Sequence, residues 1–259
     1  MYHFPPNRTE RCSEVAMSIP RLSAMASCRL SVGRECLSSN DCFRLFSKLL
    51  NLFLYETGQF SDYLLIQKPK SAYEHLRSSR ETAARKAVRF LDSLHEIERH
   101  ILDLPLSVEY FLILVGGLPS HPKRAFLVDF SSSLSSGGLP ICSHIDSYEG
   151  NFLRDFIQHP FCHAALDEMK PSRVHLYLCL SSDFQSDWLL PRPHFRLSEK
   201  CPVHILQVLI DSRDSMILDD IDSDLCLTEV KRILYGSALG KMWYASPVTL
   251  DGFCDCLLT

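Results

Sequence analysis

The chain has 259 residues, of which 46% are hydrophobic and 22% are charged, a composition typical of a globular protein. At this length we expect one domain of about 200 residues with flanking tails. The formal net charge of -4 supplies no basic surface for nucleic acid, and no apolar run approaches the roughly 20 residues of a membrane span.

The N-terminal part is predicted to consist of a flexible tail and one buried helix. Residues 1–36 contain prolines, serines and arginines without sustained periodicity, which is typical of a disordered tail. The polar residues 38–41 can cap a helix, and the residues that follow are apolar on nearly every side. We therefore expect a helix from about residue 38 to Tyr55, wedged between other elements and stopped near Gly58.

Residues 79–129 are predicted to form the centre of the core. Apolar residues recur at three- and four-residue spacing through residues 83–101, which predicts an amphipathic helix ended by Pro105. Residues 108–115 are almost continuously apolar and predict a strand buried on both faces. A second strand, residues 124–129, returns after a proline-containing turn.

The remaining residues alternate between helix and strand patterns. Residues 146–167 predict a helix that Pro160 must break or kink, and residues 174–180 and 203–210 predict strands. Residues 211–240 are acidic in their first half and helical in their second. Together these patterns predict an α+β domain with helices on one side of a sheet.

No strong catalytic or metal-binding motif is present. The eleven cysteines are scattered, odd in number and not preceded by a signal peptide, so we expect a reducing compartment. His159, Cys162 and His163 could join Cys254 and Cys256 around zinc, but neither group has the spacing of a zinc knuckle. We expect no metal, no cofactor and no enzymatic activity. A small enzyme using Cys or Ser stays open if a deep pocket holds a polarised nucleophile.

Five blocks of residues occur in one order between residues 40 and 253. They are Leu49-Leu50 with Tyr55, Gln67-Lys68-Pro69 before the long helix, Leu112 to Gly117, Asp187-Trp188 with Pro191-Arg192 and Phe195-Arg196, and Trp243 to Phe253. In this order they resemble the comet family of the spindle checkpoint, which are Mad-two-binding adaptors with a HORMA fold. The terminal Pro-Val-Thr-x-x-Gly-Phe is the most specific block.

The resemblance implies a HORMA-like domain over residues 37–259, with three helices on a mostly antiparallel sheet and the C-terminal segment folded back across it. It implies a non-catalytic adaptor that binds the closed form of the HORMA protein Mad-two. The adaptor presents that partner to a hexameric AAA+ remodelling ATPase, so that the mitotic checkpoint complex is dismantled and the checkpoint is silenced. The implied location is the nucleus and cytoplasm, and the spindle or kinetochore in mitosis.

An alternative is another HORMA protein, acting in the checkpoint, meiosis or DNA repair, that clasps a partner peptide under its own C-terminal belt. The two functions differ in whether the C-terminal strand is locked in the sheet or can open. The preference for mitotic or meiotic partners stays open.

The resemblance also assigns two partner-binding faces. The Mad-two face would contain Tyr55, Glu56, Phe152, Phe156, Ile157 and Phe161, with either Phe156 or Ile157 as its key apolar residue. The ATPase face would contain Trp188, Pro191 and Arg192, where proline pre-orders a connection between two strands and arginine supplies charge for an acidic surface. Three features depart from the family: Glu56 replaces an expected glutamine, Pro160 interrupts the contact helix, and residues 211–240 form a longer, more acidic insertion.

Overall fold

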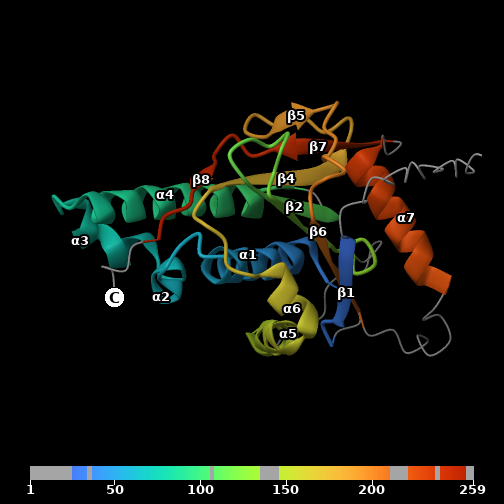
Figure 1. Cartoon of the computed structure of the whole chain (residues 1–259), viewed down its shortest axis with the longest axis horizontal. Helices are drawn as coiled ribbons and strands as arrows, with labels where there is room; N and C mark the ends of the chain where they lie inside the picture. Colours follow the sequence, from blue (N-terminus) through green and yellow to red (C-terminus); the bar gives the residue numbers. More distant parts are fainter. Residues whose placement is uncertain are drawn as a thin grey trace, which may run out of the picture.

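The computed structural model describes residues 25–33, 37–105, 108–134, 146–210, 221–236 and 240–254. Figure 1 shows a sheet flanked by helices. The strands are β1 (Met25–Ser31), β2 (Tyr110–Val115), β3 (Arg124–Asp129), β4 (Arg173–Ser181), β5 (Leu190–Arg192), β6 (Val203–Leu209), β7 (Lys241–Ala245) and β8 (Leu250–Asp251). The helices are α1 (Ser39–Glu56), α2 (Tyr63–Ile66), α3 (Glu74–Arg77), α4 (Thr82–Leu102), α5 (Asp146–Gln158), α6 (Pro160–Ala165) and α7 (Ile221–Tyr235), with a 3₁₀ turn at Lys70–Tyr73. In this part of the chain no helix is long and apolar enough to cross a membrane.

The sheet is mixed and mostly antiparallel, with β2 at its centre. Its strand order is β1-β6-β3-β2-β4-β7-β5, and β8 pairs with β4 beside β7. Only the pairs β1–β6 and β3–β6 are parallel among the described strands. Every residue of β2 is buried, which confirms the predicted strand with both faces covered. The α+β class predicted from the sequence is therefore confirmed.

The first face of the sheet is covered by α1 and α4, as the apolar patterns predict. The side chain of Ser38 accepts a hydrogen bond from the Asp41 amide, and the Asp41 carboxylate accepts one from the Ser38 amide, so a capping box starts α1. The rings of Phe46 on α1 and Phe111 on β2 are stacked 4.0 Å apart. The apolar stripe of α4, which includes Phe90, Leu91 and Leu94, is buried over the same core.

The opposite face of the sheet is covered by α7, which corrects the expectation of helices on one side. Val230, Ile233 and Leu234 of α7 are buried with Leu112 and Leu114 of β2. Alternate residues of a strand point to opposite faces, so α7 packs against the face that α1 does not cover. The helical part of the predicted insertion therefore contributes to the core, while residues 211–220 lie outside the described residues.

The predicted N-terminal tail is wrong for residues 25–31, which form β1. This strand pairs in parallel with β6 from Met25 opposite Val203 to Ser31 opposite Leu209. The Arg29 side chain donates a hydrogen bond to the Gln207 side chain at 2.8 Å. Residues 1–24 of the predicted tail lie outside the described residues.

The C-terminal segment folds back along the sheet, as predicted. Residues of β7 pair with β4 from Lys241 opposite Ser181 to Ala245 opposite Tyr177, and β8 continues along β4 to Asp251 opposite Arg173. The predicted break at Pro160 is also confirmed, because α5 ends at Gln158 and α6 begins at Pro160.

Candidate functional site

The end of α1 and the short helix α2 form an exposed patch. The chain leaves α1 through Gly58, whose φ of +68° favours glycine. The Tyr55 side chain is 39% exposed, and its ring centroid lies 5.3 Å from that of Tyr63. Leu64 is 69% exposed, and Glu56 is exposed beside them. Apolar rings and a carboxylate are thus presented together to solvent.

Three of the residues assigned to the Mad-two face point into the core of the protein and so offer little exposed surface to a partner. Phe152 and Phe156 are each 1% exposed, and Phe161 is 8% exposed. The Phe156 ring lies 6.2 Å from the ring of Phe126 on β3. Ile157, in contrast, is 45% exposed, so of these two side chains only that of Ile157 reaches solvent to a large extent.

A histidine cap fixes the orientation of the helix break that follows Ile157. The Nδ1 atom of His159 accepts a hydrogen bond from the Phe161 amide at 3.1 Å, which satisfies a free amide at the start of α6. The same nitrogen lies 3.5 Å from the Cys28 sulfur on β1. The broken helix is therefore attached to the edge strand of the sheet.

Glu56 lies between α2 and α6. Burial, together with the nearby Glu56 carboxylate, raises the pKa of the Cys162 thiol on α6 to about 11. Burial also raises the pKa of Tyr63, again with a contribution from Glu56. We name the exposed side chains of Tyr55, Glu56, Leu64 and Ile157 the helical surface.

The residues assigned to the ATPase face lie on and before a short edge strand, not in an irregular connection. Strand β5 pairs with β7, with Pro191 opposite Tyr244 and Arg192 opposite Trp243, and both Pro191 and Arg192 are exposed. Trp188 is half-buried against the main core, and its ring is stacked 4.4 Å from the His100 ring at the end of α4. The tryptophan thus anchors the base of the connection.

The aromatic neighbours of β5 hold the strand in place. The Phe195 ring lies 4.6 Å from the Tyr177 ring and 5.8 Å from the Trp243 ring. Burial raises the pKa of Tyr177, and the nearby Arg192 guanidinium opposes that shift. We name Pro191 and Arg192 on β5 the edge surface.

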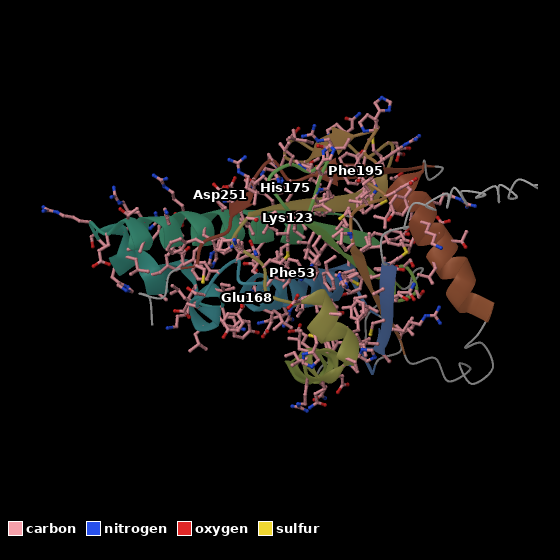
Figure 2. The ribbon with its side chains drawn as sticks, in the orientation of Figure 1. Phe53, Lys123, Glu168, His175, Phe195 and Asp251 are labelled. Atoms are coloured by element: carbon pink, nitrogen blue, oxygen red, sulfur yellow. The ribbon has the colours of Figure 1, made fainter. Side chains whose placement is uncertain are left out.

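The helical surface and the edge surface lie on different sides of the molecule. In Figure 1, β5 lies at the top of the view, while α2, α5 and α6 lie at the bottom. Figure 2 marks the same separation: Phe195 is labelled beside β5, and Glu168 near α1 and α2. Glu168 belongs to the helical side because its side chain lies next to Gly58.

The described residues do not form a metal cluster from the predicted zinc candidates. No group of three or more His, Cys, Asp or Glu side chains with metal-binding geometry occurs among them. His159 caps α6, Cys162 is buried and His163 is exposed. Burial also raises the pKa of Cys42, Cys179 and Cys201 to about 12, so these thiols stay protonated. Cys256 lies outside the described residues.

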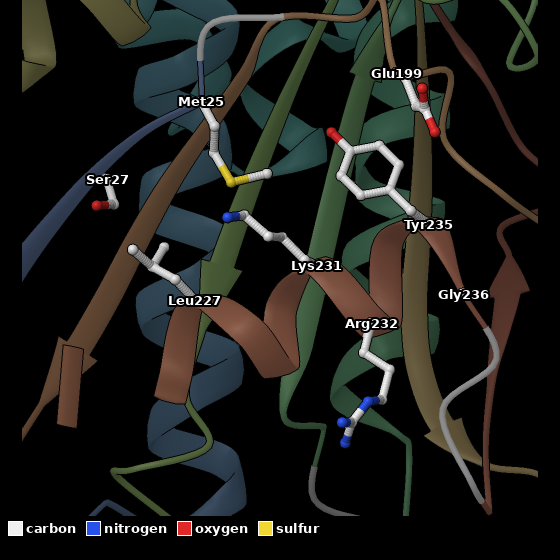
Figure 3. A pocket seen from close by; sticks show the side chains of 8 residues that line it. All are labelled: Met25, Ser27, Glu199, Leu227, Lys231, Arg232, Tyr235 and Gly236. Atoms are coloured by element: carbon white, nitrogen blue, oxygen red, sulfur yellow. The ribbon is translucent and has the colours of Figure 1, made fainter. Parts of the chain in front are cut away.

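A hollow lies between β1 and α7. Its volume is about 700 Å³, and Figure 3 shows the Lys231 amine and the Tyr235 hydroxyl inside it, with Met25 and Leu227 as apolar walls. Ser27 lines the hollow from β1. No hydrogen bond joins Ser27 to Lys231 in the described part of the chain, so the arrangement of a base-activated serine is not formed there.

Sequence reasoning missed Leu64 as a surface residue. Residues 64–66 are three consecutive apolar side chains on a helix of only four residues. Such a run cannot face one side of a helix, because successive positions are rotated by about 100°. Leu65 and Ile66 are buried, which leaves Leu64 outside.

No family model matches the sequence, and no curated protein matches it.

Proposed function

We propose that the chain is a non-catalytic adaptor of the comet type with a HORMA-like fold. The helical surface binds the closed form of a Mad-two-type HORMA protein, and the edge surface engages a hexameric AAA+ remodelling ATPase. Presentation of the bound partner to the ATPase leads to dismantling of the mitotic checkpoint complex and silences the checkpoint. We expect the protein in the nucleus and cytoplasm, and at the spindle or kinetochore in mitosis.

The observation that carries this proposal is the locked C-terminal segment. The Ser246 amide donates to the Leu176 carbonyl at 2.9 Å, between the paired stretches of β7 and β8, so pairing with β4 extends across the intervening turn. The Trp243 indole donates to the Ile233 carbonyl at 2.9 Å on one face of the sheet. The Tyr244 hydroxyl donates to the Phe184 carbonyl at 2.7 Å on the other side.

The final residues of the segment are held as tightly. The Gly252 amide donates to the Ser172 carbonyl at 2.9 Å, and the Phe253 amide donates to the Gln59 carbonyl at 2.7 Å. A belt that clasps a peptide must leave its place in the sheet to admit the peptide. Opening this segment would expose the buried side chains of Trp243, Tyr244 and Leu250. These contacts favour an adaptor that binds partners on its outer surfaces.

The chemistry of the two surfaces suits two different partners. The helical surface offers Tyr55, Leu64 and Ile157 as large side chains of the kind that anchor protein interfaces. The edge surface offers the permanent charge of Arg192 on a strand whose backbone Pro191 stiffens, so little conformational entropy is lost when an acidic partner docks.

The proposal is tested by Pro191→Ala with Arg192→Ala in a reconstituted assay of the conversion of closed Mad-two by the ATPase. We expect the double variant to bind Mad-two normally but to lose the stimulation of conversion. The control is Pro193→Ala with Arg196→Ala, which makes the same kinds of change in exposed residues just after β5. Full conversion with the β5 variant would show that the strand is only a connection.

A further inference from the structure

A polar groove separates α4 from the C-terminal segment, on neither of the two surfaces described above. Its volume is about 330 Å³. In Figure 1, β8 lies directly beside α4, and Figure 2 labels Asp251 at this place. The groove is lined on the helix side by Lys86, Arg89 and Ser93, and on the segment side by Thr249, Asp251 and Phe253.

The walls of the groove are held by the core. Phe90, in the middle of α4 and also lining the groove, is stacked on Phe60 with ring centroids 4.6 Å apart, and both are buried. Phe60 also forms a β-bridge with Phe253, which ties the opposite wall to the same place. The backbone of both walls is therefore in place before a ligand binds, which favours affinity.

Among the described residues, the two cations of the groove have no carboxylate partner. The Lys86 amine lies 5.6 Å from the centroid of the Phe253 ring, and Arg89 is exposed one helical turn further along. Within the described part of the chain, neither side chain has a carboxylate at ion-pair distance. The Asp251 carboxylate in the groove is instead 3.1 Å from the Arg173 guanidinium on β4.

We propose that this groove binds a phosphorylated serine or threonine in a segment of a partner protein. A phosphoryl group carries a charge of about -1.5 to -2 and three acceptor oxygens. Lys86 and Arg89 match that charge, and the Ser93 and Thr249 hydroxyls can donate to the remaining oxygens. A carboxylate carries half the charge and has one oxygen fewer, so it would leave part of this donor set unused.

The size of the groove favours a peptide over a free ion. A volume of 330 Å³ exceeds what one phosphoryl group fills, and it matches the lower end of ligand-sized pockets. The Phe253 ring gives an apolar surface on which the backbone or a neighbouring side chain of the peptide can rest. This inference does not depend on the proposed adaptor function.

The test uses the full chain and a degenerate peptide library with a fixed central phosphoserine or phosphothreonine, with binding followed by fluorescence polarisation. Parallel libraries carry unmodified serine and threonine, or glutamate, at the same position. We expect binding to the phosphorylated library alone, weakened by salt, and no comparable binding of inorganic phosphate.

The groove variant is Lys86→Gln with Arg89→Gln, which should weaken binding of the phosphorylated library at least about tenfold. The matched control is Arg85→Gln with Arg99→Gln, which removes two exposed charges from α4 outside the groove. Asp251→Asn should act in the opposite direction and strengthen binding by about two- to fivefold, because it removes a repulsive carboxylate. Thermal denaturation checks that all variants remain folded.

Equal binding of the phosphorylated and unmodified libraries would overturn the proposal, and so would unchanged binding by the groove variant. Equal binding of the glutamate library would overturn the assignment to a phosphoryl group. If the control variant lost as much affinity as the groove variant, the attraction would come from the general charge of α4, and the groove would not be the site.

Discussion

The neighbouring residues Phe156 and Ile157 should respond in opposite ways to truncation. Phe156 is 1% exposed and packs against Phe126, whereas Ile157 is 45% exposed on the same helix. We therefore expect Phe156→Ala to destabilise the fold. Ile157→Ala should leave the fold nearly unchanged and weaken the binding of a Mad-two-type partner.

The magnitudes follow from burial. Truncation of a fully buried phenylalanine costs about 3–5 kcal/mol, a large part of the roughly 5–15 kcal/mol that stabilises a domain. About half of the Ile157 side chain is already in water, and an exposed site leaves no closed cavity, so its truncation should cost about 1 kcal/mol. As an interface anchor, Ile157 should contribute about 2 kcal/mol or more to binding, roughly a thirtyfold change in Kd.

Urea denaturation measures the first quantity for both variants, and titration calorimetry with the closed partner measures the second for Ile157→Ala. If Phe156→Ala were as stable as the unchanged protein, the described packing of α5 would be wrong. Unchanged affinity of a folded Ile157→Ala protein would remove Ile157 from the partner surface. A stability loss for Ile157→Ala as large as that for Phe156→Ala would refute the orientation of the helix.

Two further predictions concern stability. Gly252→Ala should lower the thermal midpoint by an amount equivalent to about 1–3 kcal/mol. The added Cβ would lie 2.5 Å from the Gln59 side-chain oxygen and 2.6 Å from the Ser172 carbonyl oxygen. An unchanged midpoint in calorimetry would contradict this close approach. Stability should also fall between pH 6.5 and pH 4, because burial, with the nearby Arg124 charge, lowers the pKa of His204 from 6.5 to about 4. The unfolded chain then takes up the proton first, so the loss is absent above pH 6.5 and reaches about 3 kcal/mol near pH 4. His204→Gln should reduce the dependence of the unfolding free energy on pH, measured by urea denaturation between pH 6.5 and pH 4. An unchanged dependence would show that other groups cause the loss of stability.

The sequence determined the elements whose signals are local. Ser38 and Asp41 start α1 through two reciprocal hydrogen bonds. Because these residues are close in the chain, the local sequence alone predicts where the helix begins. The periodic apolar stripe of α4 predicts a helix because only one side of that helix is buried. The continuous apolar run of β2 predicts a strand because both of its faces are buried. The break at Pro160 follows from its missing amide hydrogen.

Other features depended on residues far apart in the chain. Strand β1 is recognisable only beside β6, because a single edge strand has no internal hydrogen bonds and weak alternation. The apolar residues of α7 did not show which face of the sheet they would cover, and packing against Leu112 and Leu114 decided it.

The candidate surfaces show the same division. Adjacent helical residues differ by about 100° in direction, so the sequence identified α5 as apolar but could not choose between Phe156 and Ile157. That choice required the rotation of α5 about its axis, which contact with Phe126 and the cap at His159 fix. Arg89 and Thr249 line the same groove beside α4 only because β8 pairs with β4. The type of a residue and its local pattern determine which chemical groups it can bind. Long-range strand pairing determines which other residues share its site.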